Sequence, residues 1–505
     1  MKKINCEVEI TRLKGELSEK NKQIKSLSQN LKKTKADAAK KLEKTKENSA
    51  KELLKTKEKS KEKIAKLQKE LKKKRRTEKN LQQRTTTITF EPIKGYGYSE
   101  LIVRLATLLY TRLNCGLRSV VIAMEVFNEV LFEILGELPC HTTIGIWMKK
   151  CGLQVYQTAG ESVHDTDYAL VTDESMMIGS EKLLLTLAVP AEHQGQPLSC
   201  EDVSVVGIAV DKSWNGENIG LQLRKASKKV GHLPGFVITD NASIMNKGVR
   251  CAGMIHHHDI SHSLAMYLER AYGKEFDFKE YVKLMTGSKF KYNMTKIAYL
   301  LPPTQRTIAR FMNLSHWVKW SSRILDKYDT LNMDEQKAFS FIPESAGIID
   351  ELSIVIQCVE RIEHLCKHKG LSKETVCKCE KSIQTNLLGG NSRMISVGEN
   401  FSEFLRKEIM LFEEDTVSRN NSSDIIESIF GKYKAIKSPN KLNGVTTSVL
   451  YLPIYTKLAN KAKAKDFNFK KALEDTRIGH IDDWAKNNLT PNLVQLRRKR
   501  LQKTG

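Results

Sequence analysis

The sequence predicts a mixed α+β protein in which helices flank one sheet, an all-helical insertion interrupts it, and a coiled coil precedes it. Between residues 166 and 265, five short apolar runs have the length of strands, and helical patterns alternate with them only after the third run. Residues 266–418 carry helical patterns in which the strand pattern does not return. Residues 1–84 contain no proline and place apolar residues at heptad spacing. These observations predict a mixed sheet covered by helices.

The segment 1–84 is predicted to be a basic coiled coil. Its seam favours a dimer through residues 8–31. The seam weakens and then resumes in another frame near Ile64, and a frame change of that kind predicts a local unwinding or a break. A single long charged helix is the alternative. The seam residues are Ile10, Leu13, Leu17, Ile24, Leu27 and Leu31.

The charge of the chain points to nucleic acid. The formal net charge is +24 over 505 residues, and residues 31–80 contain 19 Lys and 2 Arg against 8 Asp and Glu. Such an excess favours a polyanionic partner. No apolar run approaches the roughly 18 residues of a membrane span, which predicts no membrane contact. The ten cysteines lack regular spacing, so reduced thiols in a cytosolic or nuclear compartment are expected.

Residues 85–165 are predicted to form a helical DNA-binding domain of the helix-turn-helix kind. Pro139 and the following threonines would start its second helix, and Gly152 would end it. Lys149 and Lys150 near its end would contact DNA phosphates. A plain helical spacer is the alternative. Ile144, Trp147 and Met148 are expected to face inward.

The remaining chain divides into four predicted parts. Residues 166–265 form the first part of the sheet-containing core, and 266–418 are the helical insertion. Residues 419–460 close the core with a helix, and 461–505 form a basic C-terminal tail. The strands are predicted at 167–177, 182–190, 202–211, 235–241 and 256–261, with helices at 218–231, 241–254 and 263–273.

Three acidic residues form the predicted active site. Asp173 ends the first strand, Asp240 ends the fourth, and Glu427 lies early in an amphipathic helix. Hard cations prefer oxygen ligands, and two of them can clamp the attacking and leaving oxygens of a phosphoryl transfer. The three acids are therefore predicted to hold two Mg²⁺ ions, for which Mn²⁺ can substitute. Lys434 lies on the same helical face as Glu427 and would hold a phosphate.

Each acid also has a simpler interpretation. An aspartate at a strand end often caps a helix or a turn, as Asp240 could. Glu427 could be a surface residue of an amphipathic helix. The nearby acids Glu403, Glu413 and Glu414 are alternatives for the third position.

The order of these elements resembles the ribonuclease H-like catalytic core of DDE transposases, over roughly residues 98–460. The stretch TDNASIMNKGVR followed by Asp259-Ile-Ser-His262 is similar to the second-aspartate region of hAT-type transposases. Lys319-Trp320 resembles the Arg-Trp motif of their helical insertion, with lysine in place of arginine. Glu427 and Lys434 resemble the end of the Tyr-Arg-Glu-Lys signature of some bacterial transposases, where Asn420 and Ser423 replace the tyrosine and arginine.

The resemblance implies a DNA transposase that cleaves and joins strands at the ends of a mobile element. Its partners would be the terminal repeats, target DNA and a second copy of the chain. It would act in the bacterial cytoplasm and nucleoid, or in a eukaryotic nucleus. The alternatives are a catalytically inactive DNA-binding regulator, a ribonuclease H-like nuclease, and a structural protein whose basic coiled coil is the whole function.

Two further residues are expected to contact DNA. His262 lies within reach of the carboxylates and would orient the scissile phosphate, and by resemblance Trp320 would stack a displaced base. Two zinc interpretations are disfavoured. Consecutive residues of a strand point to opposite faces, so His256–His258 form a poor tetrahedral set. The spacings of Cys366, His368, Cys377 and Cys379 fit no common zinc pattern, and buried thiols are expected instead.

Overall fold

The computed structural model describes residues 2–84, 93–131, 134–175, 177–304, 311–412, 417–436, 444–491 and 493–502. The chain forms two units, Met1–Thr89 and Phe90–Gly505. No helix in the described ranges is long and apolar enough to cross a membrane.

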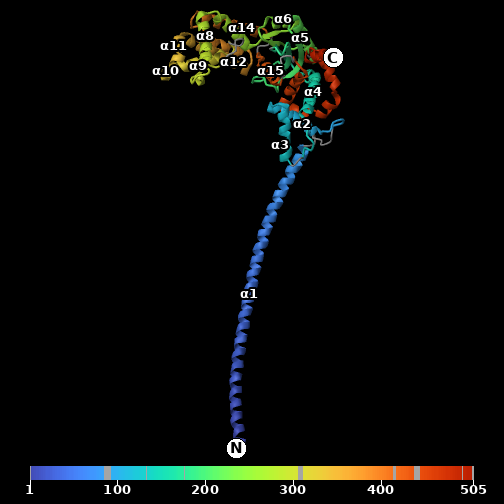
Figure 1. The fold of residues 1–505 in the computed structure, drawn as a ribbon, viewed down its shortest axis with the longest axis vertical. Coiled ribbons are helices and arrows are strands. Elements are labelled where there is room, and N and C mark those ends of the chain that lie inside the picture. The colour runs from blue at the N-terminus through green and yellow to red at the C-terminus, as the bar shows by residue number, and fades with distance from the viewer. Residues whose placement is uncertain are drawn as a thin grey trace. The chain divides into compact units, whose positions relative to one another are not determined.

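The first unit is one helix, α1 (Lys2–Arg84), of 83 residues (Figure 1). The predicted break is wrong, because the helix runs uninterrupted through the weak part of the seam. The six seam residues between Ile10 and Leu31 are each 51–65% exposed. An isolated helix gains its stability mainly from packing an apolar face. The association of α1 with another helix through this seam stays a prediction.

The second unit is built on one mixed sheet in the order β3-β2-β1-β4-β5. Strands β1 (Tyr168–Glu174), β2 (Lys182–Pro190) and β3 (Ser204–Asp211) are antiparallel neighbours. The short strands β4 (Val237–Thr239) and β5 (His256–His258) extend the sheet from β1 in parallel. All five predicted strands are confirmed, and so is the mixed sheet.

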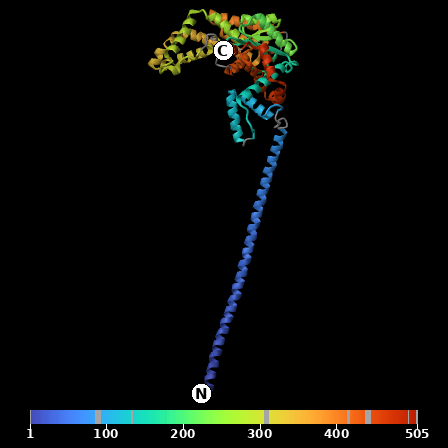
Figure 2. The same cartoon turned by 45° about the vertical axis from the view of Figure 1, so that its right-hand side comes forward.

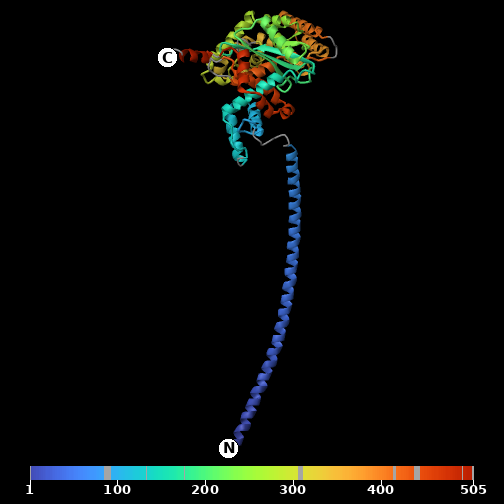
Figure 3. The ribbon, with the colours of Figure 1, turned by 90° about the vertical axis from the view of Figure 1, so that its right-hand side faces the viewer.

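Helices cover both faces of the sheet (Figure 3). Leu170 and Val237 pack under α5 (Gly216–Val230) and α6 (Ser243–Ala252). Ala169, Val171 and Ile238 belong to the larger core on the other face. Since successive strand residues point to opposite faces, the odd-numbered positions of β1 face the larger core.

The larger core joins segments from both ends of the second unit. It contains residues of α2 (Glu100–Leu113), α3 (Leu117–Val130) and α4 (His141–Thr158) together with the C-terminal helices. The predicted separate domain at 85–165 is therefore wrong for its described residues. The C-terminal elements are α15 (Asp424–Ile436), η4 (Thr447–Leu450), α16 (Tyr451–Ala459), α17 (Lys461–Asp466), α18 (Phe469–Asp475), α19 (Ile478–Asn488) and α20 (Leu493–Gln502). Because Phe469 and Trp484 lie in the same core, the predicted basic tail is confined to the part after α19.

Helix α4 is a core helix, which corrects the helix-turn-helix prediction. Ile144, Trp147 and Met148 are buried as expected, but the helix continues through Gly152 to Thr158. A Cβ at Gly152 would lie 1.8 Å from the Leu450 carbonyl oxygen, so this glycine permits close packing of α4 against η4 and does not end the helix. Ten residues separate α3 from α4, whereas a helix-turn-helix uses about 3–4.

The helical insertion has a hydrophobic core of its own. This core begins with α7 (Ile260–Tyr272), a few residues before the predicted boundary, and ends with α14 (Ser392–Met410). In Figures 1 and 2 the insertion extends to one side of the sheet. Its other elements are α8 (Phe276–Tyr292), η1 (Ala298–Leu300), α9 (Leu314–Lys327), η3 (Tyr328–Thr330), α10 (Met333–Ala338), α11 (Phe341–Glu344), α12 (Ala346–Lys369) and α13 (Lys373–Asn386).

Candidate active site

Asp173 lies near the end of β1, and Asp240 directly follows the neighbouring strand β4. Leu170 pairs with Val237 and Val171 with Ile238 across the parallel strands β1 and β4. Continued by two residues, this register places Asp173 opposite Asp240. Both side chains follow the alternation of the face that carries the larger core, the face against which α15 packs.

The carboxyl group of Asp173 is in an unusual electrostatic environment. Burial and the negative charge of Asp240 raise its pKa to about 7, and Glu427 adds a smaller effect in the same direction. The positive charge of His262 and a backbone hydrogen bond oppose this shift. A carboxyl group with a raised pKa beside other acids is typical of a site that binds a cation or moves a proton. Asp240 and the distant Glu427 therefore both act electrostatically on Asp173.

Glu427 is held in place by the helix that carries it. Ile425, Ile426, Ile429 and Phe430 are buried in the larger core, as the sequence predicts. Glu427 itself lies in the first turn of α15 with its side chain 53% exposed. Lys434 lies seven residues further along the helix and is exposed. Glu403 is an exposed residue of α14 paired with Lys407, and Glu413 and Glu414 lie outside the described residues.

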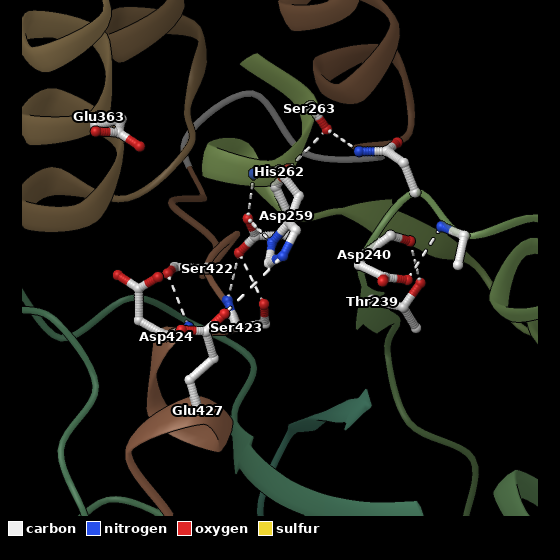
Figure 4. Close-up of polar contacts among 12 residues, drawn as sticks. Thr239, Asp240, Asp259, His262, Ser263, Glu363, Ser422, Ser423, Asp424 and Glu427 are labelled. Carbon is white, nitrogen blue, oxygen red and sulfur yellow. Dashed lines mark hydrogen bonds and ion pairs between the residues drawn. The ribbon is translucent and has the colours of Figure 1, made fainter. Parts of the chain in front are cut away.

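His262 lies between Asp259 and Glu427 (Figure 4). Its Nδ1 lies 3.0 Å from Asp259 Oδ1, and its Nε2 lies 3.9 Å from Glu427 Oε1. Burial disfavours the charged imidazole, but the hydrogen bond and charge of Asp259, with Asp240 and Glu427, raise its pKa to about 9. His262 is therefore an imidazolium at neutral pH, with Nδ1 fixed by Asp259 and Nε2 directed at Glu427.

Asp259 positions His262 through hydrogen bonds. It is fully buried and accepts hydrogen bonds from the backbone N–H of His262 and from the N–H and hydroxyl of Ser423. Burial alone would raise its pKa, yet these donors and the charge of His262 lower it. Asp259 thereby ties the start of α7 to the residue that precedes α15. The sequence showed the Asp-x-x-His spacing, but nothing in it paired Asp259 with a serine 164 residues away.

The helical insertion also reaches the site through Lys367, which the sequence did not single out. Lys367 Nζ lies 2.6 Å from Asp424 Oδ2, at the first residue of α15. Glu363, one turn earlier on α12, has a raised pKa because it is buried and lies near Asp424 and Asp259. Helix α12 therefore contributes charged groups beside the start of the helix that carries Glu427.

No protein-family model and no curated protein matches this chain. The resemblance to DDE transposases therefore depends on the residues of the site. The charged centre of this site consists of Asp173, Asp240, His262 and Glu427.

Three residues that were predicted to contact DNA are buried or partly buried in the structure. Lys150 is 8% exposed, and its ammonium donates a 2.5 Å hydrogen bond to the Tyr96 hydroxyl. Burial lowers the pKa of Lys149, a partly buried neighbour. Trp320 is half-buried, donates to the Leu300 carbonyl oxygen at 3.1 Å and packs edge-on against Phe339. Lys150 and Trp320 therefore stabilise the interior of this structure, and their predicted contacts with DNA are not supported.

The three consecutive histidines form hydrogen-bonding contacts with Glu408 and Thr239. The buried carboxylate of Glu408, on α14, lies 2.6 Å from His257 Nδ1 and 2.9 Å from His258 Nδ1. His256 Nε2 lies 2.7 Å from the Thr239 hydroxyl. The two Glu408 contacts fasten α14 to β5, and the His256 contact joins β5 to β4. In the other disfavoured cluster Cys366 and Cys379 are buried as expected, whereas Cys377 is exposed.

Proposed function

We propose that this chain is a DNA transposase of the DDE class, which cleaves strands at the ends of a mobile element and joins them to target DNA. The observation that carries the proposal is the electrostatic effect on Asp173 of both Asp240 and Glu427, an acid that lies beyond the helical insertion in the sequence. Each of the two later acids raises the pKa of Asp173. A surface glutamate on an amphipathic helix has no reason to be brought to the ends of two strands.

The topology supports a ribonuclease H-like core. Three antiparallel strands in sequence are followed by two parallel strands on the other side of β1. The acids lie at the end of the first strand, directly after the fourth, and on a late helix against the same face. This arrangement agrees with the resemblance that the sequence shows, including the helical insertion before the glutamate.

The donor set suits two Mg²⁺ ions. Asp173, Asp240 and Glu427 offer only carboxylate oxygens, which Mg²⁺ prefers. Burial and, after it, the negative charge of Asp240 raise the pKa of Asp173, and a bound cation would offset both effects. In the described residues, no three His, Cys, Asp or Glu side chains are arranged to hold one metal ion. Binding would therefore require a side-chain rearrangement, for which the half-exposed Glu427 has room. Bound metal would activate the nucleophile and stabilise charge on the transferred phosphate.

The residues of the chain have distinct roles in this proposal. The His262 imidazolium would bind a non-bridging oxygen of the scissile phosphate or give a proton to a leaving oxygen. Asp259 holds Nδ1 of His262 and so leaves Nε2 toward the acids. Lys434, exposed on the helix of Glu427, would contact the DNA backbone. α1 would pair two chains, and thus two element ends, and bind phosphates without sequence preference.

The experiment is a strand-cleavage assay with Mg²⁺ on DNA that carries the inverted repeats flanking the gene. Asp173→Asn and Asp240→Asn should abolish cleavage and leave DNA binding within a few-fold. The matched control is Asp211→Asn, which changes an aspartate at the end of β3. Cleavage by both strand variants at the wild-type rate would reject the proposal.

Two alternatives give different products in that assay. Cleavage without strand transfer would indicate a nuclease of similar core. End binding without cleavage by the wild-type chain, under any divalent metal, would indicate an inactive DNA-binding regulator.

A further inference from the structure

A cavity with polar and charged lining residues lies at the edge of the sheet away from Asp173. It has a volume of about 230 Å³ and is bounded by the C-terminal half of α4, the start of β3 and the helices α16 to α18. Ser204, at its wall, pairs with Ala188 at the far end of β2, whereas Asp173 pairs with Leu185. The cavity therefore belongs to a different part of the molecule from the three acids.

Three lysines from three successive helices converge on this cavity. Lys457 comes from α16, Lys463 from α17 and Lys471 from α18, and Asp466 is the only acid in the lining. None of the three ammonium groups forms an ion pair with a carboxylate of the described residues. The Nζ of Lys463 donates to the Glu201 carbonyl oxygen at 3.1 Å. Burial and the charge of Lys457 lower the pKa of Lys463, while Asp202 and Glu201 oppose this effect.

Neutral donors accompany the lysines. Asn468 accepts the backbone N–H of Lys471 at 2.8 Å through its side-chain oxygen, which leaves its amide NH₂ as a donor. Gln154 and Ser204 also line the cavity. In contrast, the hydroxyls of Thr158 and Thr456 already donate to backbone carbonyl oxygens. The donors that remain are therefore mainly ammonium and amide groups, which suit a multiply charged oxyanion.

We infer that this cavity binds the phosphate group of a ligand, at a site separate from the three acids. Its size admits one phosphate group with the start of its ester. A neighbouring cavity of about 860 Å³ shares Ser162, Ser204 and Lys463 with it and has room for the rest of a small ligand. The phosphate would belong either to a free phosphorylated molecule or to the DNA backbone.

The experiment measures phosphate binding to the full chain by calorimetry at constant ionic strength, with chloride as the reference anion. Lys463→Met and Lys457→Met each remove one ammonium while keeping a long side chain. Lys465→Met is the matched control, because Lys465 is an exposed lysine of α17 outside the lining. We expect saturable binding in the wild type and the control, and about tenfold weaker binding in each cavity variant.

Competition then identifies the source of the phosphate. If a DNA duplex that lacks the element sequence displaces inorganic phosphate, the cavity binds the DNA backbone. If a nucleoside monophosphate displaces inorganic phosphate and the duplex does not, the cavity binds a free phosphorylated ligand. Absence of saturable binding, or equal binding by the control and both folded cavity variants, would overturn the inference. The strand-cleavage assay tests the three acids separately, so its outcome does not depend on these phosphate-binding results.

Discussion

Asp259 accepts two hydrogen bonds from Ser423, one from its backbone N–H at 2.6 Å and one from its hydroxyl at 3.0 Å. This pair fixes the chain that returns from the helical insertion directly before α15. A neighbouring contact, from the Ile260 N–H to the Asn421 carbonyl oxygen at 3.0 Å, fixes the same segment. The position of the helix that carries Glu427 therefore depends on an acid that does not itself belong to the predicted trio.

Asp259→Asn should destabilise the second unit and reduce cleavage together. The carboxylate is fully buried and charged, so its loss should lower the free energy of unfolding by about 2–3 kcal/mol. Ser423→Ala removes only the hydroxyl donor and should cost about 1 kcal/mol. Denaturant unfolding measures both, with Ser428→Ala on the exposed side of α15 as the control. Wild-type stability of Asp259→Asn would contradict the positioning role.

Glu427→Gln should abolish cleavage with little effect on stability. The side chain is 53% exposed, so its charge contributes little to folding, whereas metal ligation requires that charge. The control is Glu403→Gln on α14, an acid of similar exposure that pairs with Lys407. If Glu427→Gln cleaves normally, the third acid has to be sought elsewhere, in the undescribed segment that contains Glu413 and Glu414.

The sequence predicted the sheet well because local patterns determined it. Each strand is a short apolar run between breaks, and the two aspartates follow such runs directly. The packing of α4 against the C-terminal helices was not predictable from local patterns. Its entry through Thr142 and Thr143 and its lysines suit a recognition helix, but its burial depends on α16 and η4, about 300 residues later. Tertiary packing of that range leaves no local signal.

The candidate site shows the same division. Asp173, Asp240 and the anchored helix of Glu427 follow from local pattern. The partners that arrange them do not, because Ser423 and Lys367 are ordinary polar residues in sequence and gain their roles only through long-range contacts. Trp320 illustrates the reverse error. Its motif suggested a base-stacking residue, yet its ring packs against Phe339.

Raising the pH should weaken the second unit through His262. Its pKa in the folded chain is about 9, above its ordinary value of 6.5. The folded state therefore holds the proton more tightly, and the resulting stability is complete below pH 6.5 and is lost as the pH rises through 9. We expect a decrease of about 1–2 kcal/mol in the unfolding free energy of metal-free protein across that range. His262→Gln should flatten this part of the profile, and an identical profile would contradict the assignment.

Gly152→Ala should destabilise the second unit, although alanine favours helices. The new Cβ would meet the Leu450 carbonyl oxygen, so α4 and η4 would have to separate at a cost of about 1–3 kcal/mol. Gly431→Ala is the matched control, because no atom lies within 4 Å of a Cβ built at Gly431 of α15. That change should stabilise the protein by up to about 1 kcal/mol. Thermal unfolding of the two variants should therefore shift in opposite directions.

Removal of residues 1–84 should lower both the oligomeric state and the affinity for non-specific DNA. The seam of α1 is exposed in the single chain, and its lysines would neutralise DNA phosphates, so binding should also depend less steeply on salt. Replacement of Leu17 and Ile24 by Asn separates the two effects, because it disrupts the seam without changing the charge. The deletion should change the mass by light scattering and the salt slope, whereas the seam variant should change mainly the mass. An unchanged mass in both variants would show that α1 does not pair the chains, and the pairing of element ends would then require a surface of the second unit.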